Sequence, residues 1–205
     1  YSQGLFPMAY GAHTNHIHWF CPEKRGQLSI QNIHIPRRLK KTVRSMKLGG
    51  MPYEIHINRN FRAVMEECAK SKTGRKETWI NQKIIDAFYD LHKIGHAHSV
   101  ETWQNDVLIG GLYGVSIGCA FFGESMFSNM RDASKVALVH LVARLYHSGF
   151  KILDTQFTND HLQQFGVYEI SHHEYIKQLI PLLNIDCVFD FIKPDEKTLI
   201  RSYFT

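Results

Sequence analysis

An apolar stretch broken by glycines in the middle of the chain constrains its fold more than any other feature. Two runs rich in β-branched and aromatic residues, 107–117 and 119–127, are separated by Gly118. This is the pattern of a β-hairpin. One carboxylate, Glu124, interrupts the second run. A buried charge is costly unless it is paired or used. Glu124 is therefore either an edge-strand residue that reaches water or a functional acid on the floor of a pocket.

The length of 205 residues suits one large domain, or a domain with a small appendage. Hydrophobic residues make up 44% of the chain, so it can bury a substantial core and disorder is not expected. No window approaches the roughly 18 apolar residues of a membrane span. The formal net charge of +5 favours an anionic partner but does not by itself identify a nucleic acid.

The cysteines are widely spaced and form no Cys-x-x-Cys pair: Cys21, Cys68, Cys119 and Cys187. This spacing predicts free thiols in a reducing cytosol. The first residues show no secretory signal pattern, and we expect a cytoplasmic protein. The chain opens without Met, on a segment that resembles the interior of a longer sequence. We therefore expect that an N-terminal portion is missing.

Periodicity and turn signals divide the chain into alternating strands and helices. Besides the hairpin, strands are expected at residues 27–35, 53–58, 96–103, 151–157 and 167–170. Helices are expected from Pro36 to residue 47, at 60–70, from an Asn81 cap to residue 94, and at 133–147, 159–165 and 174–183, with a polar loop at 71–76. Residues 184–205 show no clear pattern. Hairpins combined with helices indicate an α/β layer with a mixed sheet.

Basic residues dominate the first predicted helix. Leu39, Val43 and Met46 are spaced to bury one face. The remaining positions include six cations without an interspersed acid: Arg37, Arg38, Lys40, Lys41, Arg44 and Lys47. A solvated basic face explains this pattern, and so does a footprint for a phosphate backbone, whose counterions such cations displace.

Two histidine groups are candidate metal sites. The first is His13, His16 and His18 with Cys21, but structural zinc sites usually add a second close pair of ligands, which does not follow. The second is His96 and His98, two apart on one predicted strand without an evident acid or Cys partner. Loop and structural histidines explain both groups better, and no metal is expected.

Asp154 and Gln156 lie two apart in the predicted strand 151–157, so their side chains should point to one face. A carboxylate and a carboxamide placed together could share one amine-binding site. The alternative is a turn at the end of the strand, in which Asp154 caps backbone groups.

Several motifs resemble one known family. GGLYGV at 110–115 and FFGESMFS at 121–128 are similar to the signature of the leucyl/phenylalanyl-tRNA–protein transferases. The resemblance continues in order through TWI at 78–80, GHAHS at 95–99, DASK at 132–135, DTQ at 154–156, HL at 161–162, FG at 165–166 and EI at 169–170. Ordered matches over most of the chain are far more specific than one short motif.

The resemblance implies an acetyltransferase-like (GNAT-type) domain at 31–205, with residues 1–30 as part of a smaller N-terminal subdomain. It implies transfer of leucine or phenylalanine, with methionine as a further candidate, from aminoacyl-tRNA to the α-amine of acceptor proteins that begin with Arg or Lys. The product would carry an N-terminal degradation signal. The ester is already activated, so no cofactor is expected. We expect a monomer that does not bind membranes.

The resemblance also implies roles for single residues. Asp154 and Gln156 would receive the incoming amine, with Asp154 as base or as an electrostatic orienter acting through Gln156. Glu124 would hold a polar group of the aminoacyl end, such as its α-ammonium. An apolar pocket would be formed by Leu112, Phe121, Leu138 and Leu153.

The tRNA would meet two further regions. The acceptor stem would lie on Arg37, Arg38, Lys40, Lys41 and Arg44. The terminal adenine would stack on Trp79, which otherwise reads as a core anchor. Met8 and Phe88 stand where the family commonly has Trp and Tyr, which makes this end of the donor site less typical.

Two rival functions are compatible with parts of the sequence. An acyl-CoA N-acyltransferase usually carries a glycine-rich pyrophosphate loop after its central strand. The corresponding stretch, 129–134, has no glycine, which counts against that class. A non-catalytic relative that binds tRNA or peptide is opposed by the presence of Glu124, Asp154 and Gln156.

Overall fold

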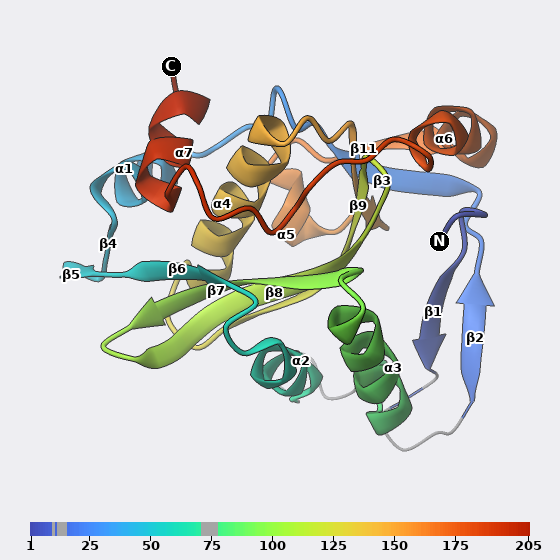
Figure 1. The fold of residues 1–205 in the computed structure, drawn as a ribbon, viewed down its shortest axis with the longest axis horizontal. Coiled ribbons are helices and arrows are strands. Elements are labelled where there is room, and N and C mark those ends of the chain that lie inside the picture. Colours follow the sequence, from blue (N-terminus) through green and yellow to red (C-terminus); the bar gives the residue numbers. More distant parts are fainter. Residues whose placement is uncertain (10, 12–15, 71–77) are drawn as a thin grey trace.

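The computed structural model describes residues 1–9, 11, 16–70 and 78–205. In this part of the chain a mixed seven-stranded sheet has the order β11-β3-β10-β9-β8-β7-β6 (Figure 1). Its strands are β3 (Lys24–Leu28), β6 (Glu54–Ile57), β7 (Ala97–Gln104), β8 (Val107–Ile117), β9 (Ala120–Ser128), β10 (Ile152–Gln156) and β11 (Tyr168–Ser171). The predicted α/β class with a mixed sheet is confirmed.

The predicted hairpin is the centre of this sheet. Strands β6 to β9 form an antiparallel meander, and β9 is followed by the helix α4 (Ala133–His147) and by β10, which is parallel to β9. A parallel pair requires such a crossover. Pairing of β9 with β10 ends at Phe122 opposite Asp154, while β9 continues to Ser128. We call this point the β9–β10 fork.

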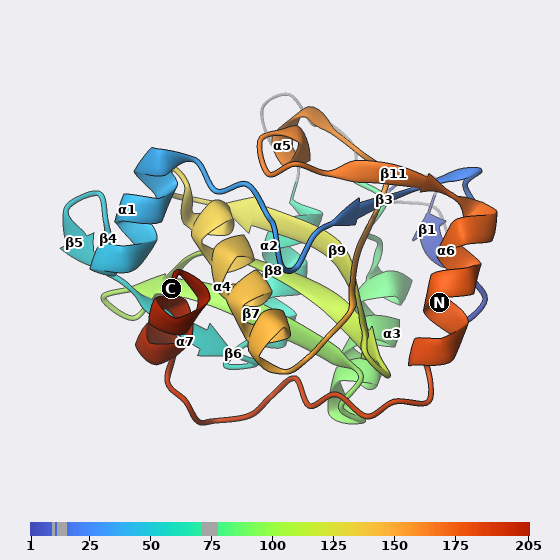
Figure 2. The same ribbon diagram turned by 90° about the horizontal axis from the view of Figure 1, so that it is seen from above.

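Helices pack on both faces of the sheet (Figures 1 and 2). On the face that we call the α4 face, α4 shares one hydrophobic core with α1 (Arg37–Ser45), α5 (Asp160–Gln163) and α7 (Glu196–Tyr203). The opposite, α3 face carries α2 (Phe61–Ala69), α3 (Gln82–Lys93) and α6 (His172–Leu179) on a second core. Each strand contributes alternate side chains to the two cores, so Leu112 belongs to the first and Tyr113 to the second.

Local signals place several helix ends correctly. Asn60 and Asn81 accept hydrogen bonds from the backbone N–H groups of Ala63 and Ile84, the geometry of an N-cap. The predicted helix 133–147 is confirmed with both its ends. The first helix starts after Pro36 as expected and buries Leu39 and Val43.

Other boundaries differ from the prediction. The strand expected at 27–35 is β3, which begins at Lys24 and ends at Leu28. The helix expected at 174–183 begins at His172 and continues after Leu179 as the 3₁₀ helix η1 (Ile180–Leu182). Beyond it lies α7, which the sequence did not predict, with Leu199 and Ile200 buried. The loop expected at 71–76 lies outside the described residues.

The prediction of four free thiols was wrong for two of them. Cys119 and Cys187 form a disulfide with a Cα–Cα distance of 5.1 Å, although they are 68 residues apart. Residues after η1 run back along the turn between β8 and β9, and linear spacing cannot reveal such a return. Cys21 and Cys68 form no disulfide.

Two small sheets lie beside the main one. The first joins β1 (Phe6–Ala9) to β2 (Ile17–Phe20), and the second joins β4 (Lys47–Leu48) to β5 (Met51–Pro52). Among the described residues, no helix has the length and apolar character needed to cross a membrane.

Candidate active site

Glu124 lies in a β-bulge inside the sheet. In the β8–β9 ladder Tyr113 pairs with Ser125 and Gly114 pairs with Gly123, which leaves Glu124 as an extra residue. A bulge bends the strand and redirects a side chain. Glu124 lies just past Phe122, the last β9 residue that pairs with β10, and its carboxylate is hydrogen-bonded within the protein.

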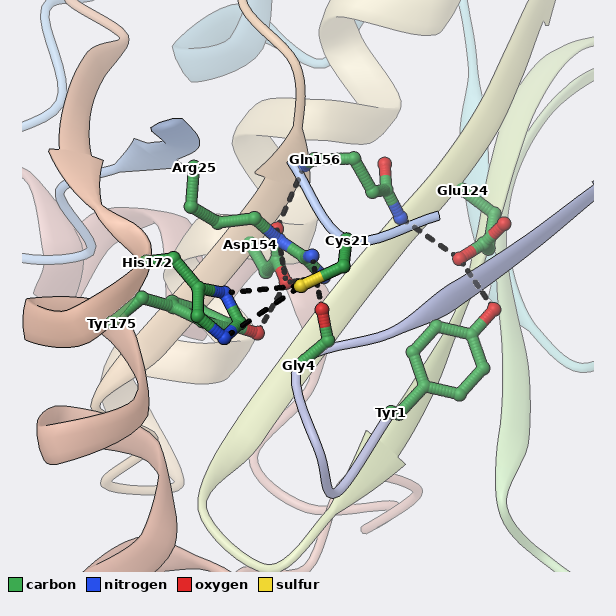
Figure 3. Close-up of polar contacts among 9 residues, drawn as sticks. All are labelled: Tyr1, Gly4, Cys21, Arg25, Glu124, Asp154, Gln156, His172 and Tyr175. Carbon is green, nitrogen blue, oxygen red and sulfur yellow. Dashed lines mark hydrogen bonds and ion pairs between the residues drawn. The ribbon is translucent and has the colours of Figure 1, made fainter. Parts of the chain in front are cut away.

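The Glu124 carboxylate is partly buried on the α3 face and receives two neutral donors. The Tyr1 hydroxyl donates to Oε1 at 2.7 Å, and the Gln156 amide Nε2 donates to the same oxygen at 2.8 Å (Figure 3). Burial raises the pKa of Glu124 to about 8; the Tyr1 hydrogen bond opposes this shift and the charge of Asp154 adds to it. Glu124 therefore changes protonation near neutral pH.

Asp154 is fully buried and its oxygens are taken up by donors. Arg25 donates through Nε at 3.0 Å to both oxygens and through Nη2 at 2.7 Å to Oδ2. The Tyr175 hydroxyl donates at 2.5 Å, and the backbone N–H of Gln156 donates at 2.7 Å. A carboxylate offers about four acceptor positions, so the four donor groups leave little room for a substrate proton.

The residues around Asp154 keep the site charged and fixed. Burial alone would lower the pKa of Arg25, but hydrogen bonding to Asp154 and its charge outweigh burial and raise that pKa. Burial, with the charge of Asp154, raises the pKa of Tyr175, so its hydroxyl stays a donor. Arg25 also donates to the carbonyl of Gly4 at 2.7 Å. This network joins the N-terminal segment, β3, β10 and α6.

Gln156 connects the two acids. Its backbone N–H binds Asp154 and its side-chain amide binds Glu124. The expected strand alternation is interrupted, because the β10–β3 register shifts between Asp154 and Gln156 and Gln156 has a φ of 57°. An extra residue at this point re-aims the Gln156 side chain.

The four predicted pocket residues come together on the other face. Each is at most 3% exposed and all belong to the core under α4: Leu112, Phe121, Leu138 and Leu153. The apolar and the polar groups thus lie on opposite faces of the sheet. They approach at the fork, where Phe121 pairs with Leu153 and the next pair is Phe122 with Asp154.

The residues predicted for the tRNA 3′ end divide into two groups. Trp79 is partly buried and its carbonyl accepts the Ala9 N–H at 3.3 Å, which brings it beside the β1 residue that follows Met8. Phe88 is 2% exposed, with its ring edge-on to Tyr113 at 5.4 Å between centroids. In this structure Phe88 supports the core of the α3 face.

The basic helix α1 lies on the surface of the α4 face, away from the fork. Arg38 forms an ion pair with Asp132, and Lys40 and Arg44 lie over the Phe204 ring at 4.8 and 5.0 Å. Arg37 and Lys41 are exposed on the same helix.

Of the histidines considered as metal ligands, His98 has a structural environment. His98 is buried and forms hydrogen bonds with Asn58 at 3.0 Å and Ser116 at 3.1 Å. His13 lies outside the described residues. In the rest of the chain that the structure describes, no three His, Cys, Asp or Glu side chains are grouped to hold a metal ion.

Arg25, Tyr175 and Tyr1 are site residues that the sequence did not reveal. Arg25 bonds to a residue 129 positions away, so no local pattern marks it. The one available signal was chemical, because a fully buried Asp needs a cationic partner.

The structure thus places a titratable acid and a buried ion-paired acid together at the fork of a mixed sheet, and comparison with known proteins identifies the family. The family model for "Leucyl/phenylalanyl-tRNA protein transferase" matches residues 27–180. Proteins named leucyl/phenylalanyl-tRNA–protein transferase are 49% identical over 93% of this chain and 88% of the relative (Paramagnetospirillum magneticum), and 50% identical over 97% and 89% (Maricaulis maris). A third, from Caulobacter vibrioides, is 53% identical over 87% of this chain and 80% of its own length.

The chain belongs to the leucyl/phenylalanyl-tRNA–protein transferase family, a family of aminoacyltransferases.

Proposed function

We propose that this protein transfers leucine or phenylalanine from aminoacyl-tRNA to the N-terminal α-amine of an acceptor protein. The observation that carries the proposal is the chain of hydrogen bonds from Glu124 through Gln156 to Asp154 at the β9–β10 fork. The three polar residues of the family motifs are thereby held in one connected group. Acceptors that begin with Arg or Lys, whose product carries a degradation signal, are part of the same proposal.

Glu124 would hold the α-ammonium of the aminoacyl ester. Both of its neutral donors bind Oε1, and Oε2 has no partner shown among the described residues. A charge-assisted hydrogen bond to Oε2 would fix the ester relative to the fork.

Gln156 would orient the acceptor amine. Its Nε2 is bound to Glu124, which directs the amide oxygen elsewhere, toward an N–H donor of the substrate. Asp154 would act as an orienter and not as the base, because its oxygens are already bound by Arg25, Tyr175 and the Gln156 backbone. An α-amine with a pKa of about 7.7–8.0 is partly neutral without a base. Positioning accounts for a large share of such a rate.

The acyl side chain would enter among Leu112, Phe121, Leu138 and Leu153. These residues are packed in the present structure, so an acyl group would separate them at the fork. A pocket of this type discriminates poorly between side chains that differ by one methylene, since that difference is worth only about 1–3 kcal/mol.

The tRNA would be held by α1 and by the segment around Trp79. Arg37, Arg38, Lys40, Lys41 and Arg44 would contact the acceptor stem, and Trp79 with Met8 would receive the terminal adenine, with Phe88 behind them as core support. The tRNA contacts aside, a GNAT-type relationship is supported by the parallel strands β9 and β10, which separate next to the bulge in β9.

We further propose a domain boundary near residue 30 and a monomeric state. Strand β3 precedes that boundary and pairs within the main sheet.

The test is transfer of radiolabelled leucine from charged tRNA to a peptide with N-terminal Arg. Wild type should transfer, and Glu124→Ala and Gln156→Ala should lose most of the activity while remaining folded by circular dichroism. Binding of charged tRNA without any transfer would indicate a non-catalytic relative. Full transfer by both variants would refute the proposed chemistry.

A further inference from the structure

The segment between η1 and α7, residues 183–195, contains neither helix nor strand and passes from the β8–β9 turn across the end of α4 (Figure 2). We call it the C-terminal strap. Three of its apolar side chains face outward: Ile185 is 49% exposed, Val188 61% and Ile192 90%. Phe189, by contrast, is 2% exposed.

Phe189 packs directly on a residue of the proposed acyl pocket. Its ring stacks on that of Phe121, with centroids 5.0 Å apart and an interplanar angle of 21°. The His98 ring lies 4.5 Å away, and Phe150 meets Phe189 edge-on at 6.3 Å. Phe189 therefore forms the wall behind Phe121 on the α4 face.

A disulfide ties the strap to the turn directly before β9, the strand that carries Phe121. Cys187, two residues before Phe189, forms the disulfide with Cys119, which lies two residues before Phe121. The approach is close: a Cβ on Gly118 would meet the Leu182 carbonyl oxygen at 2.0 Å. Arg144 adds a non-covalent tie, donating to the carbonyls of Phe189 and Phe191 at 2.9 and 3.0 Å.

We propose that Phe189 is a positioning residue for the acyl pocket, and that the Cys119–Cys187 disulfide controls how firmly it holds Phe121. This inference rests on the proposed function, since it concerns the same pocket. With the disulfide formed, the strap is held near the fork both by the Cys119–Cys187 bond and by the packing of Phe189 on Phe121. With the thiols reduced, only non-covalent contacts hold the strap, among them the Phe189 packing and the Arg144 hydrogen bonds, and the wall behind Phe121 loosens.

The redox step is a thiol–disulfide exchange with a low-molecular-weight disulfide. The two thiols of Cys119 and Cys187 lose two electrons and two protons, and one S–S bond forms between them. The S–S bond of the small disulfide breaks and yields two small thiols. A small dithiol reverses the reaction.

The experiment compares oxidised and reduced wild type, Cys187→Ser, Phe189→Ala and the double variant, with the thiol state verified by alkylation and mass. Steady-state transfer is measured with leucyl- and phenylalanyl-tRNA. Cys21→Ser controls for other thiol chemistry, and Val188→Ala controls for change in the strap itself.

We expect reduction, Cys187→Ser and Phe189→Ala each to raise KM for leucyl-tRNA about two- to tenfold, the size of one lost aromatic contact. The preference for leucine over the larger phenylalanine should fall, while kcat changes little. Reduction should have little further effect in Phe189→Ala, because the contact it controls is already lost. The two control variants should behave as wild type.

Amide hydrogen exchange of residues 118–122 and 183–192 supplies a readout without turnover. Faster exchange in both segments on reduction supports the coupling. Unchanged KM, preference and exchange in Cys187→Ser and Phe189→Ala would overturn the inference. If no form of the protein transfers leucine, the proposed function fails, and the exchange data still decide whether the disulfide controls the contact with Phe121.

Discussion

At the scale of single residues, the two acids of the site differ because their donors differ. Asp154 accepts from a cation, a hydroxyl and a backbone N–H in a fully buried position. Glu124 accepts only from neutral donors, both on one oxygen. A low-dielectric environment favours the charged form only where such charge compensation is present. Asp154 is therefore the ionised acid that holds the network together, and Glu124, which titrates, is the acid available to substrate.

Glu124→Gln should raise thermal stability at pH 8.5 and change it little near pH 4. The folded-state pKa of about 8 lies above the ordinary 4.5, so the folded protein binds more protons in this window and loses stability as pH rises through it. Gln does not ionise and avoids the loss. Each kcal/mol of difference in the free energy of unfolding should shift Tm by roughly 2–4 °C. Calorimetry at both pH values checks this, with the exposed Glu23→Gln as control; an equal Tm difference at both would contradict it.

Arg25→Met should destabilise the protein by about 3–5 kcal/mol, because it leaves the buried charge of Asp154 without its partner. The double variant Arg25→Met/Asp154→Leu removes both charges and should recover part of this loss. Urea unfolding of the two variants measures the difference. A double variant less stable than the single one would show that an uncompensated Asp154 charge is not what destabilises Arg25→Met.

At the scale of elements, the bulge in β9 determines what the sheet presents on its two faces. The extra residue changes the strand alternation, so that Phe122 and Phe127 lie in the same core although they are five positions apart. The same insertion exposes Glu124 to the α3 face beside Gln156. The bulge thus allows a strand that otherwise packs in the core to place a carboxylate in the candidate active site.

Gly114→Ala should disrupt this bulge far more than Gly123→Ala. A Cβ on Gly114 would meet the Phe122 carbonyl oxygen at 2.4 Å and the Phe121 ring at 2.5 Å, whereas on Gly123 the nearest atom is the Asp154 carbonyl oxygen at 3.3 Å. We expect a loss of at least about 2 kcal/mol for the first variant and clearly less for the second. Denaturant unfolding checks the order, and comparable losses would refute the packing argument.

The basic helix α1 should act through charge alone. Arg37→Glu/Lys41→Glu should weaken tRNA binding and lower the slope of log K against log salt by roughly one unit per lost phosphate contact. The control is Lys177→Glu on α6, which reverses one exposed cation, so the change in slope is compared per reversed charge. Filter binding at several salt concentrations measures both. An equal change of slope in the control would mean that the protein's net charge, and not a contact between α1 and tRNA, explains the effect.

At the scale of the whole molecule, what the sequence predicted was local. The hairpin 107–127, the Asn60 and Asn81 caps and the helix 133–147 follow from periodicity and end signals within a few residues. Contacts between distant segments were not predictable: Arg25 and Asp154 are 129 positions apart, and Cys119 and Cys187 are 68 apart. The motifs pointed to Glu124, Asp154 and Gln156 but not to the difference between an ion-paired Asp154 and a titratable Glu124, which depends on donors brought in by other elements.

An acid on α7, Glu196, anchors the far end of the C-terminal strap to α4. Glu196 on α7 accepts from His140 Nδ1 at 2.9 Å and pairs with Arg144, both on α4. Burial would raise its pKa, but the hydrogen bonds and charges of His140 and Arg144 outweigh burial and lower it. This contribution to stability is present above the ordinary value of 4.5 and is lost as pH falls through the lowered value.

Glu196→Gln should therefore release α7 and the C-terminal strap already at neutral pH, since an amide cannot neutralise the buried Arg144. We expect faster proteolytic cleavage within residues 183–205 and a loss of about 1.5–3 kcal/mol, the value of a hydrogen bond to a charged group. The exposed neighbour Lys197→Gln is the matched control. Cleavage as slow as in wild type would mean that packing of Leu199 and Ile200 holds α7 without the ion pair. The C-terminal strap would then be held by its apolar contacts, the disulfide and the Arg144 hydrogen bonds to the Phe189 and Phe191 carbonyls.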